Sequence, residues 1–168
     1  KQLFFNIPDE YAEKLPGVAA KFANAINDVI DRAMARFEPV RLLVRCTAAG
    51  FAHNRRRRGV KGGNPSMDDI VDHDVPVLEC LDGAGRRKAI VFGYACHNTT
   101  IPPDDLRYCA DWAGFAKEQL QHSNRGATAI YIPGAGADQD PEPHGSVELS
   151  RQHGVELADA VQRALDEP

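Results

Sequence analysis

The stretch AIVFGYACHNTT, residues 89–100, joins an apolar run to a group of polar side chains at its end. Residues 89–92 are apolar at every position, which is typical of a strand that has both faces covered. We therefore predict a strand over residues 87–95 in the centre of a sheet. The run reaches Cys96, and four polar side chains follow it directly: His97, Asn98, Thr99 and Thr100.

The residues before this strand predict its partners. Residues 75–81 form a second strand-like run, and residues 82–85, Asp-Gly-Ala-Gly, form a turn sequence between the two runs. A four-residue loop between two such runs is typical of a β-hairpin. Residues 40–46 alternate apolar side chains with arginines and predict a further, half-exposed strand.

Helices are predicted before and after these strands along the chain. Apolar residues recur at spacings of three and four over residues 16–37 and again over residues 146–165, where Ser146 is the expected N-cap. Gly154 lies on the apolar stripe of the second helix, and we expect it to allow a close approach to the sheet. Asp111 is the expected cap of a shorter helix that ends at about Gln121.

The order of elements predicts the fold class. A short apolar strand is expected over residues 127–132, and a helical crossover would make it parallel to the strand over residues 87–95. The sequence therefore predicts a single α/β domain over residues 1–168, with a layered mixed sheet flanked by helices.

Composition limits the classes of protein. The chain has 168 residues, of which 43% are hydrophobic and 26% charged, as in a globular domain. Its net charge of −4 argues against a general nucleic-acid binder, and no apolar run is long enough to cross a membrane. The four cysteines are widely spaced, which favours buried free thiols, although disulfides remain an alternative in an exported protein.

Three polar clusters follow the predicted strands, over residues 53–58, 97–100 and 134–140. In open α/β sheets, ligands bind beyond the carboxyl ends of parallel strands. We therefore expect the second and third clusters to converge at one edge of the sheet.

Each cluster is compatible with more than one role. His97 suits a metal ligand, a general base or a histidine held in the core, and Asn98 and Thr99 suit either a strand cap or contacts to substrate oxygens. The four arginines of residues 55–58 suit a solvated patch or a guanidinium that binds a carboxylate or phosphate. The glycines of residues 134–136 suit a sharp turn or backbone N–H groups that face a ligand.

Six motifs, taken in order, carry a resemblance to a known family. They are NRR at 54–56, VDHDVPVLEC at 71–80, VFGYACHNTT at 91–100, DWAGFA at 111–116, GAGADQDP at 134–141 and ELSRQHGVELADAV at 148–161. This set resembles the N-terminal catalytic domain of the neutral/alkaline non-lysosomal ceramidases, in particular their divergent bacterial members. The chain is similar to part of that larger catalytic domain.

The resemblance implies zinc-dependent hydrolysis of an amide bond. His97 matches a family zinc ligand, and Arg55, which follows Asn54, matches an arginine that contacts the reacting group. Asp111 matches an aspartate that precedes a helix, and we expect it among the substrate-binding residues with Asn54, Asn98 and Thr99. The resemblance places the other zinc ligands outside this chain and implies an exported or periplasmic protein.

One departure from the family lies in the loop over residues 134–141. Gln139 stands where ceramidases carry a serine, and a glutamine can only orient water or donate a hydrogen bond. We expect Gln139 and Asp138 to act in catalysis, and Gly134 and Gly136 to position substrate or water. The predicted substrate is a small-molecule or lipid amide, with no specific support for a sphingolipid. The alternative is a non-catalytic module that binds an anionic small molecule or glycan.

Overall fold

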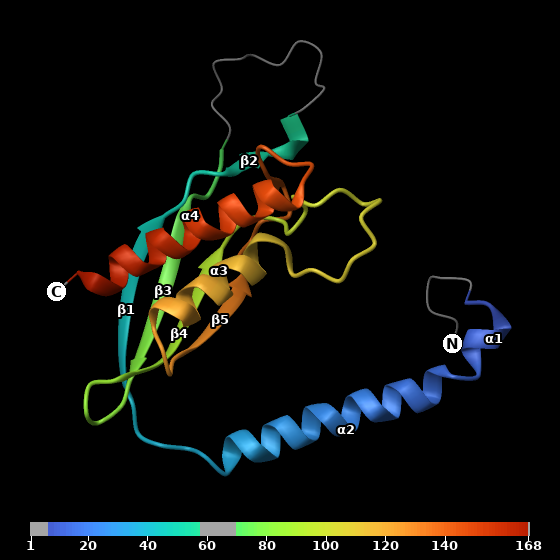
Figure 1. Cartoon of the computed structure of the whole chain (residues 1–168), viewed down its shortest axis with the longest axis horizontal. Helices are drawn as coiled ribbons and strands as arrows, with labels where there is room; N and C mark the ends of the chain where they lie inside the picture. The colour runs from blue at the N-terminus through green and yellow to red at the C-terminus, as the bar shows by residue number, and fades with distance from the viewer. Residues whose placement is uncertain (1–6, 58–69, 168) are drawn as a thin grey trace. The chain divides into compact units, whose positions relative to one another are not determined.

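The computed structural model describes residues 7–57 and 70–167 of the chain. It contains two compact units, residues 1–39 and residues 40–168. The first unit holds α1 (Asp9–Ala12) and α2 (Leu15–Met34), and the second holds all the strands (Figure 1). Arg58, the last residue of the arginine run, lies outside the described residues.

The helix α2 carries the predicted apolar stripe on its surface. It begins beside Pro16, as predicted, but it ends at Met34 and does not reach Phe37. No residue of α2 is buried, and the side chain of Phe22 is 69% exposed. No helix in the described residues has the length and apolarity needed to span a bilayer.

The second unit is built on a four-stranded mixed sheet in the order β1-β3-β4-β5. Its strands are β1 (Arg41–Ala48), β3 (Asp74–Leu81), β4 (Arg87–Tyr94) and β5 (Thr128–Pro133). β3 pairs antiparallel with both β1 and β4, while β4 and β5 are parallel. The structure thus confirms the hairpin, the central place of β4 and the parallel crossover.

A second, two-stranded sheet was not predicted. It consists of β2 (Ala52–Asn54) and β6 (Gln139–Pro141), which pair antiparallel, and the short 3₁₀ helix η1 (Arg55–Arg57) follows β2. The sequence gives no sign of these two strands, because a strand of three residues is too short to show a period of two.

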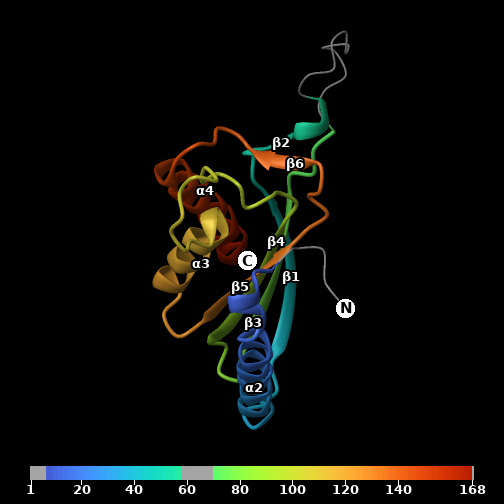
Figure 2. The same ribbon diagram turned by 90° about the vertical axis from the view of Figure 1, so that its right-hand side faces the viewer.

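Two helices cover one face of the four-stranded sheet. They are α3 (Asp111–Ser123) and α4 (Val147–Asp166), and Figure 2 shows both on the same side of the strands. Ser146 caps α4 as predicted, because its side chain accepts a hydrogen bond from the backbone N–H of Leu149 at 3.1 Å. Side chains from α3, α4 and the covered face of the sheet form the core, with Trp112, Leu120, Leu157, Ile90 and Phe92 among the fully buried ones.

The prediction for Gly154 was wrong about the neighbour. A Cβ atom at this position would lie 2.5 Å from the Cβ of Phe115 and 2.8 Å from the backbone oxygen of Trp112. Both of these residues belong to α3. The glycine therefore permits close packing of the two helices and not of α4 on the sheet.

The other face of the sheet is apolar and open. Val44, Leu78, Val91 and Ile130 form a row across all four strands. Val44 is 81% exposed, and Ile130 is also exposed. The predicted alternation of β1 is therefore confirmed, but its apolar side faces outward.

The opposite side of β1 contributes to a buried ionic cluster. Glu79 of β3 is 3% exposed, and its carboxylate lies 2.7 Å from Nε of Arg87 and 3.6 Å from Nε of Arg45. Arg87 also donates to the side-chain oxygen of Asn124 and, at 3.4 Å, to the backbone oxygen of Leu165. One carboxylate thus links three strands to the C-terminal end of α4.

The four cysteines are free, as favoured, but the predicted burial holds for Cys96 alone. Cys46 and Cys109 are exposed, whereas Cys96 is buried. Burial, followed by the nearby charges of Asp140 and Asp111, raises the pKa of the Cys96 thiol to about 12. Only the thiolate reacts with alkylating agents, so the cysteines differ in reactivity.

We expect iodoacetamide at pH 8 to alkylate Cys46 and Cys109 rapidly and to leave Cys96 unmodified in the folded protein. At that pH, roughly one Cys96 thiol in ten thousand is ionised. Peptide mass spectrometry of timed samples, with a urea-unfolded sample as the control, measures the three rates. Alkylation of Cys96 as fast as that of Cys109 before unfolding would contradict the expectation.

Candidate functional site

The polar segments after β2, β4 and β5 converge at one end of the sheet, beside the β2–β6 pair (Figure 2). The backbone N–H of His97 donates to the backbone oxygen of Gln139 at 2.9 Å. The backbone N–H of Arg55 donates to the backbone oxygen of Asp138 at 2.8 Å. The predicted convergence of the last two clusters is confirmed, and the arginine segment joins them.

The side chains of Arg55 and His97 meet at one carbonyl group. The guanidinium Nε of Arg55 donates to the backbone oxygen of Ala137 at 3.2 Å. Nε2 of His97 lies 3.4 Å from the same oxygen and donates to it when it carries the proton. A cation and an imidazole, which the sequence separates by some forty residues, therefore lie side by side.

Two carboxylates complete this group, which we call the strand-end cluster: Asn54, Arg55, His97, Asp138 and Asp140. Oδ1 of Asp140 lies 3.5 Å from Nη1 of Arg55, and Oδ2 of Asp138 accepts from Nδ2 of Asn54, also at 3.5 Å. Sequence reasoning did not select Asp140 as a site residue. Asp140 is brought to the site because it pairs with His53 in the β2–β6 sheet, and the sequence does not reveal this pairing.

Asn54 and Gln139 are largely committed to holding the backbone. Asn54 is buried, donates to the backbone oxygen of Ile70 at 3.2 Å and accepts from the backbone N–H of Arg56 at 3.0 Å. Gln139 is 4% exposed, and its Oε1 accepts from the backbone N–H of Asp72 at 3.1 Å. Both amides thus connect the short sheet to the segment that leads into β3.

The two glycines of the loop after β5 differ in their surroundings. Gly134 borders an apolar hollow of about 380 Å³ on the open face of the sheet, together with Gly93, Ala95 and Pro133. At Gly136, an added Cβ would lie 2.5 Å from the backbone nitrogen of Cys96. Gly136 is therefore required for the close passage of two backbones, and an added Cβ at Gly134 would also lie only 3.1 Å from the backbone nitrogen and Cα of Ala95.

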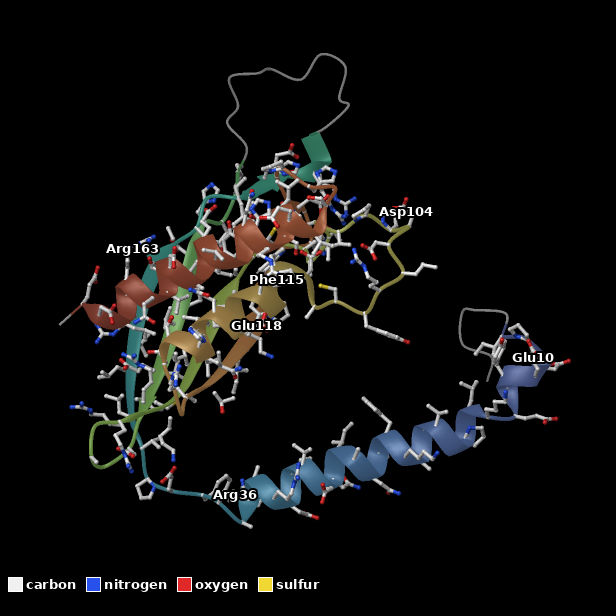
Figure 3. All side chains as sticks on the ribbon, viewed as in Figure 1. Glu10, Arg36, Asp104, Phe115, Glu118 and Arg163 are labelled. Carbon is white, nitrogen blue, oxygen red and sulfur yellow. The ribbon has the colours of Figure 1, made fainter. Side chains whose placement is uncertain are left out.

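The remaining predicted residues lie on or near the loop between β4 and α3, whose outer part carries Asp104 (Figure 3). Asn98 and Thr99 are exposed, and Nδ2 of Asn98 donates to the backbone oxygen of Ala110 at 3.4 Å. Asp111 is buried away from solvent. The prediction that Asp111 caps α3 was wrong. Asp111 is the first helical residue, and Ala110 occupies the N-cap position.

Tyr94, the last residue of β4, is fully buried at this end of the sheet. The hydroxyl of Tyr94 donates to the backbone oxygen of Ala49 at 2.9 Å and accepts from the backbone N–H of Ala52 at 3.1 Å. Burial raises the pKa of Tyr94 well above its ordinary value. The charged side chains of the strand-end cluster are therefore Arg55, Asp138 and Asp140.

The described residues do not form a metal centre by themselves. In residues 7–57 and 70–167, no group of three or more His, Cys, Asp or Glu side chains is placed to hold a metal ion. A protein zinc site takes three or four such ligands. His97 can supply one nitrogen to a zinc ion, and the other ligands would have to come from outside these residues.

Comparison with known proteins places the fold. No protein-family model matches the chain, and no curated protein matches it by sequence. A structure titled "Ceramidase complexed with C2" aligns with a TM-score of 0.69 and 18% identity, over 82% of this chain and 24% of that chain. A neutral ceramidase from Pseudomonas aeruginosa aligns with a TM-score of 0.68 and 20% identity over the same shares. The chain therefore has a ceramidase-like α/β fold and spans about a quarter of the length of these proteins.

Proposed function

We propose that the chain is part of a ceramidase-like hydrolase that cleaves an amide or related bond with zinc as its cofactor. The observation that carries this proposal is the meeting of Arg55 and His97 at the backbone oxygen of Ala137, with Asp138 and Asp140 beside them. This group lies at the carboxyl ends of β4 and β5, where α/β sheets bind ligands. The ceramidase-like fold supports the class of reaction.

The residues of the chain have distinct roles in this proposal. Arg55 binds a substrate carboxylate or stabilises the negative charge that develops on the scissile carbonyl oxygen. Asp140 orients its guanidinium, since the two groups are 3.5 Å apart. Asp138 and the backbone of residues 134–138 position substrate or water, and Gln139 fixes this loop from beneath.

Zinc, when bound, activates water and polarises the carbonyl group. His97 is the proposed ligand from this chain, and its half-buried ring lies at the rim of the strand-end cluster. The described residues supply no complete metal site. The roles proposed for Arg55, Asp138 and Asp140 therefore do not depend on the position of the zinc ion. A small-molecule or lipid amide is the proposed substrate class.

A panel of N-acyl amides tests the proposal when the complete hydrolase to which the chain is proposed to belong is assayed with and without a chelator. We expect hydrolysis of at least one amide, its loss on incubation with EDTA and its recovery on addition of zinc. Magnesium is the control metal, because it prefers oxygen ligands and should not restore activity after EDTA treatment. Absence of turnover on every amide would contradict the hydrolase and leave a binding module, whereas activity that is insensitive to EDTA would contradict the cofactor.

A further inference from the structure

The start of α3 contains an unusual backbone conformation. Asp111 has a φ of 52°, in the left-handed region, and no other non-glycine residue in the described part of the chain has a positive φ. For a residue with a Cβ this conformation is strained. Such strain persists only where surrounding contacts hold the residue in place, and those contacts indicate what the conformation is for.

The carboxylate of Asp111 reaches back to the loop that follows β4. It is 5% exposed, and its Oδ2 accepts from the backbone N–H of Ile101 at 3.0 Å. Its Oδ1 accepts from the backbone N–H of Trp112 at 2.6 Å and from Oγ of Ser150 at 2.9 Å. The carboxylate therefore fixes the far end of residues 97–101 and joins it to both helices.

Trp112 fixes the near end of the same loop. Its indole Nε1–H donates to the backbone oxygen of His97 at 2.9 Å. The ring itself is fully buried and packs edge-on against Phe51, Tyr94 and Tyr131, with ring centroids 5.1–5.8 Å apart. An indole held on three sides is a rigid donor, so the position of this carbonyl is well defined.

These contacts form one clamp over residues 97–101. Ala110, Asp111 and Trp112 contact Asn98, Ile101 and His97 respectively. The backbone N–H of His97 is held from the opposite side by the backbone oxygen of Gln139. The imidazole of His97 has only its own side-chain torsions left to vary, and it lies toward Ala137.

We propose that Asp111 and Trp112 are positioning residues, which hold the loop over residues 97–101 so that the His97 ring meets Arg55 at the oxygen of Ala137. This assigns Asp111 a role in building the site and not in contacting substrate. The catalytic consequence rests on the proposed function, but the position of the loop can be measured without any activity.

Trp112→Phe tests the proposal in the intact 168-residue chain, because it removes the indole N–H and keeps an aromatic ring in the core. Tyr131→Phe is the matched control, since it removes a donor to the backbone oxygen of Tyr94 (3.1 Å) from the same group of rings. The readout is the NMR chemical shifts of the His97 ring and of the His97 and Asn98 amides. We expect large shifts at these signals for Trp112→Phe and little change for Tyr131→Phe, with both variants still folded.

Asp111→Gly provides a second, independent variant. Glycine adopts the same φ without strain, so this change removes the carboxylate alone. Ser150→Ala is its control, because it deletes one donor to that carboxylate without touching the loop. We expect the Ile101 amide to lose protection from hydrogen exchange in Asp111→Gly and to keep it in Ser150→Ala. If Asp111→Gly does not fold, Trp112→Phe decides the result.

The proposal is overturned if the His97 signals move no more in Trp112→Phe than in Tyr131→Phe. Where hydrolysis is detectable, Trp112→Phe should lower kcat at least tenfold and leave KM within about twofold, as expected when a reacting group is misplaced. Shifted His97 signals in a protein without hydrolase activity would uphold the clamp and reject the proposed function. Unshifted His97 signals in Trp112→Phe, together with hydrolase activity of the unchanged protein, would reject the clamp and uphold the proposed function.

Discussion

Replacing Glu79 with leucine is expected to lower the free energy of unfolding by about 3–5 kcal/mol. The change removes the carboxylate that faces both Arg45 and Arg87, at 3.6 and 2.7 Å. Both guanidinium groups are mostly buried and would stay charged without a counter-ion. Urea unfolding followed by circular dichroism measures the loss.

Two further variants show whether burial is the cause. Arg86→Ala breaks the ion pair between Arg86 and Asp82, in which the arginine side chain is 79% exposed. This change should lower the free energy of unfolding by no more than about 1 kcal/mol. The triple variant Arg45→Met, Glu79→Leu, Arg87→Met removes all three charges and should recover most of the stability lost in Glu79→Leu. Equal losses for Glu79→Leu and Arg86→Ala would show that the buried cluster has no special weight.

His97→Ala is expected to lower hydrolysis at least about 100-fold, the lower end of the range for losing an essential proton-transfer group or ligand. Its effect on the free energy of unfolding should stay below about 1 kcal/mol. The reason is that the two backbone hydrogen bonds of His97, to Gln139 and Trp112, survive the substitution, whereas its ring contact to the oxygen of Ala137 is long, at 3.4 Å.

His122→Ala is the matched control, since His122 is an exposed histidine in the last turn of α3. It should leave activity, stability and zinc content unchanged. His97→Ala should also bind less zinc, as measured by elemental analysis of the hydrolase-active protein. A His97→Ala protein that keeps its full zinc content would reject the ligand role, and one that keeps its activity would remove His97 from the site.

The sequence predicted most of the four-stranded sheet because each strand carries a local signal. The alternation in residues 40–46, the Asp-Gly-Ala-Gly turn and the continuous apolar run at 89–92 lie within single windows of the chain. The β2–β6 pair has no such signal, because three-residue strands depend on a partner far away. The prediction that Gly154 packs against the sheet was wrong for a similar reason. An apolar stripe on a helix does not indicate whether it packs against a sheet or against another helix.

The site was predictable as a meeting of segments but not as a set of roles. Polar residues after parallel strands had to converge, and His97 and Gln139 do so. The sequence could not show that the amides of Asn54 and Gln139 hold backbone groups, or that Asp111 faces the loop and not the solvent. These differences depend on side-chain burial, which residue type and spacing leave undetermined.

The β2–β6 pair has a consequence for the order of folding. Arg55 and Asp140 are 85 residues apart along the chain, so bringing them together closes a long loop and carries a large entropic cost. The β3–β4 hairpin closes over only a few residues and can form early. The strand-end cluster should therefore assemble among the last events of folding. By the same reasoning, the short sheet can open locally and dissolve the cluster while the four-stranded sheet stays intact.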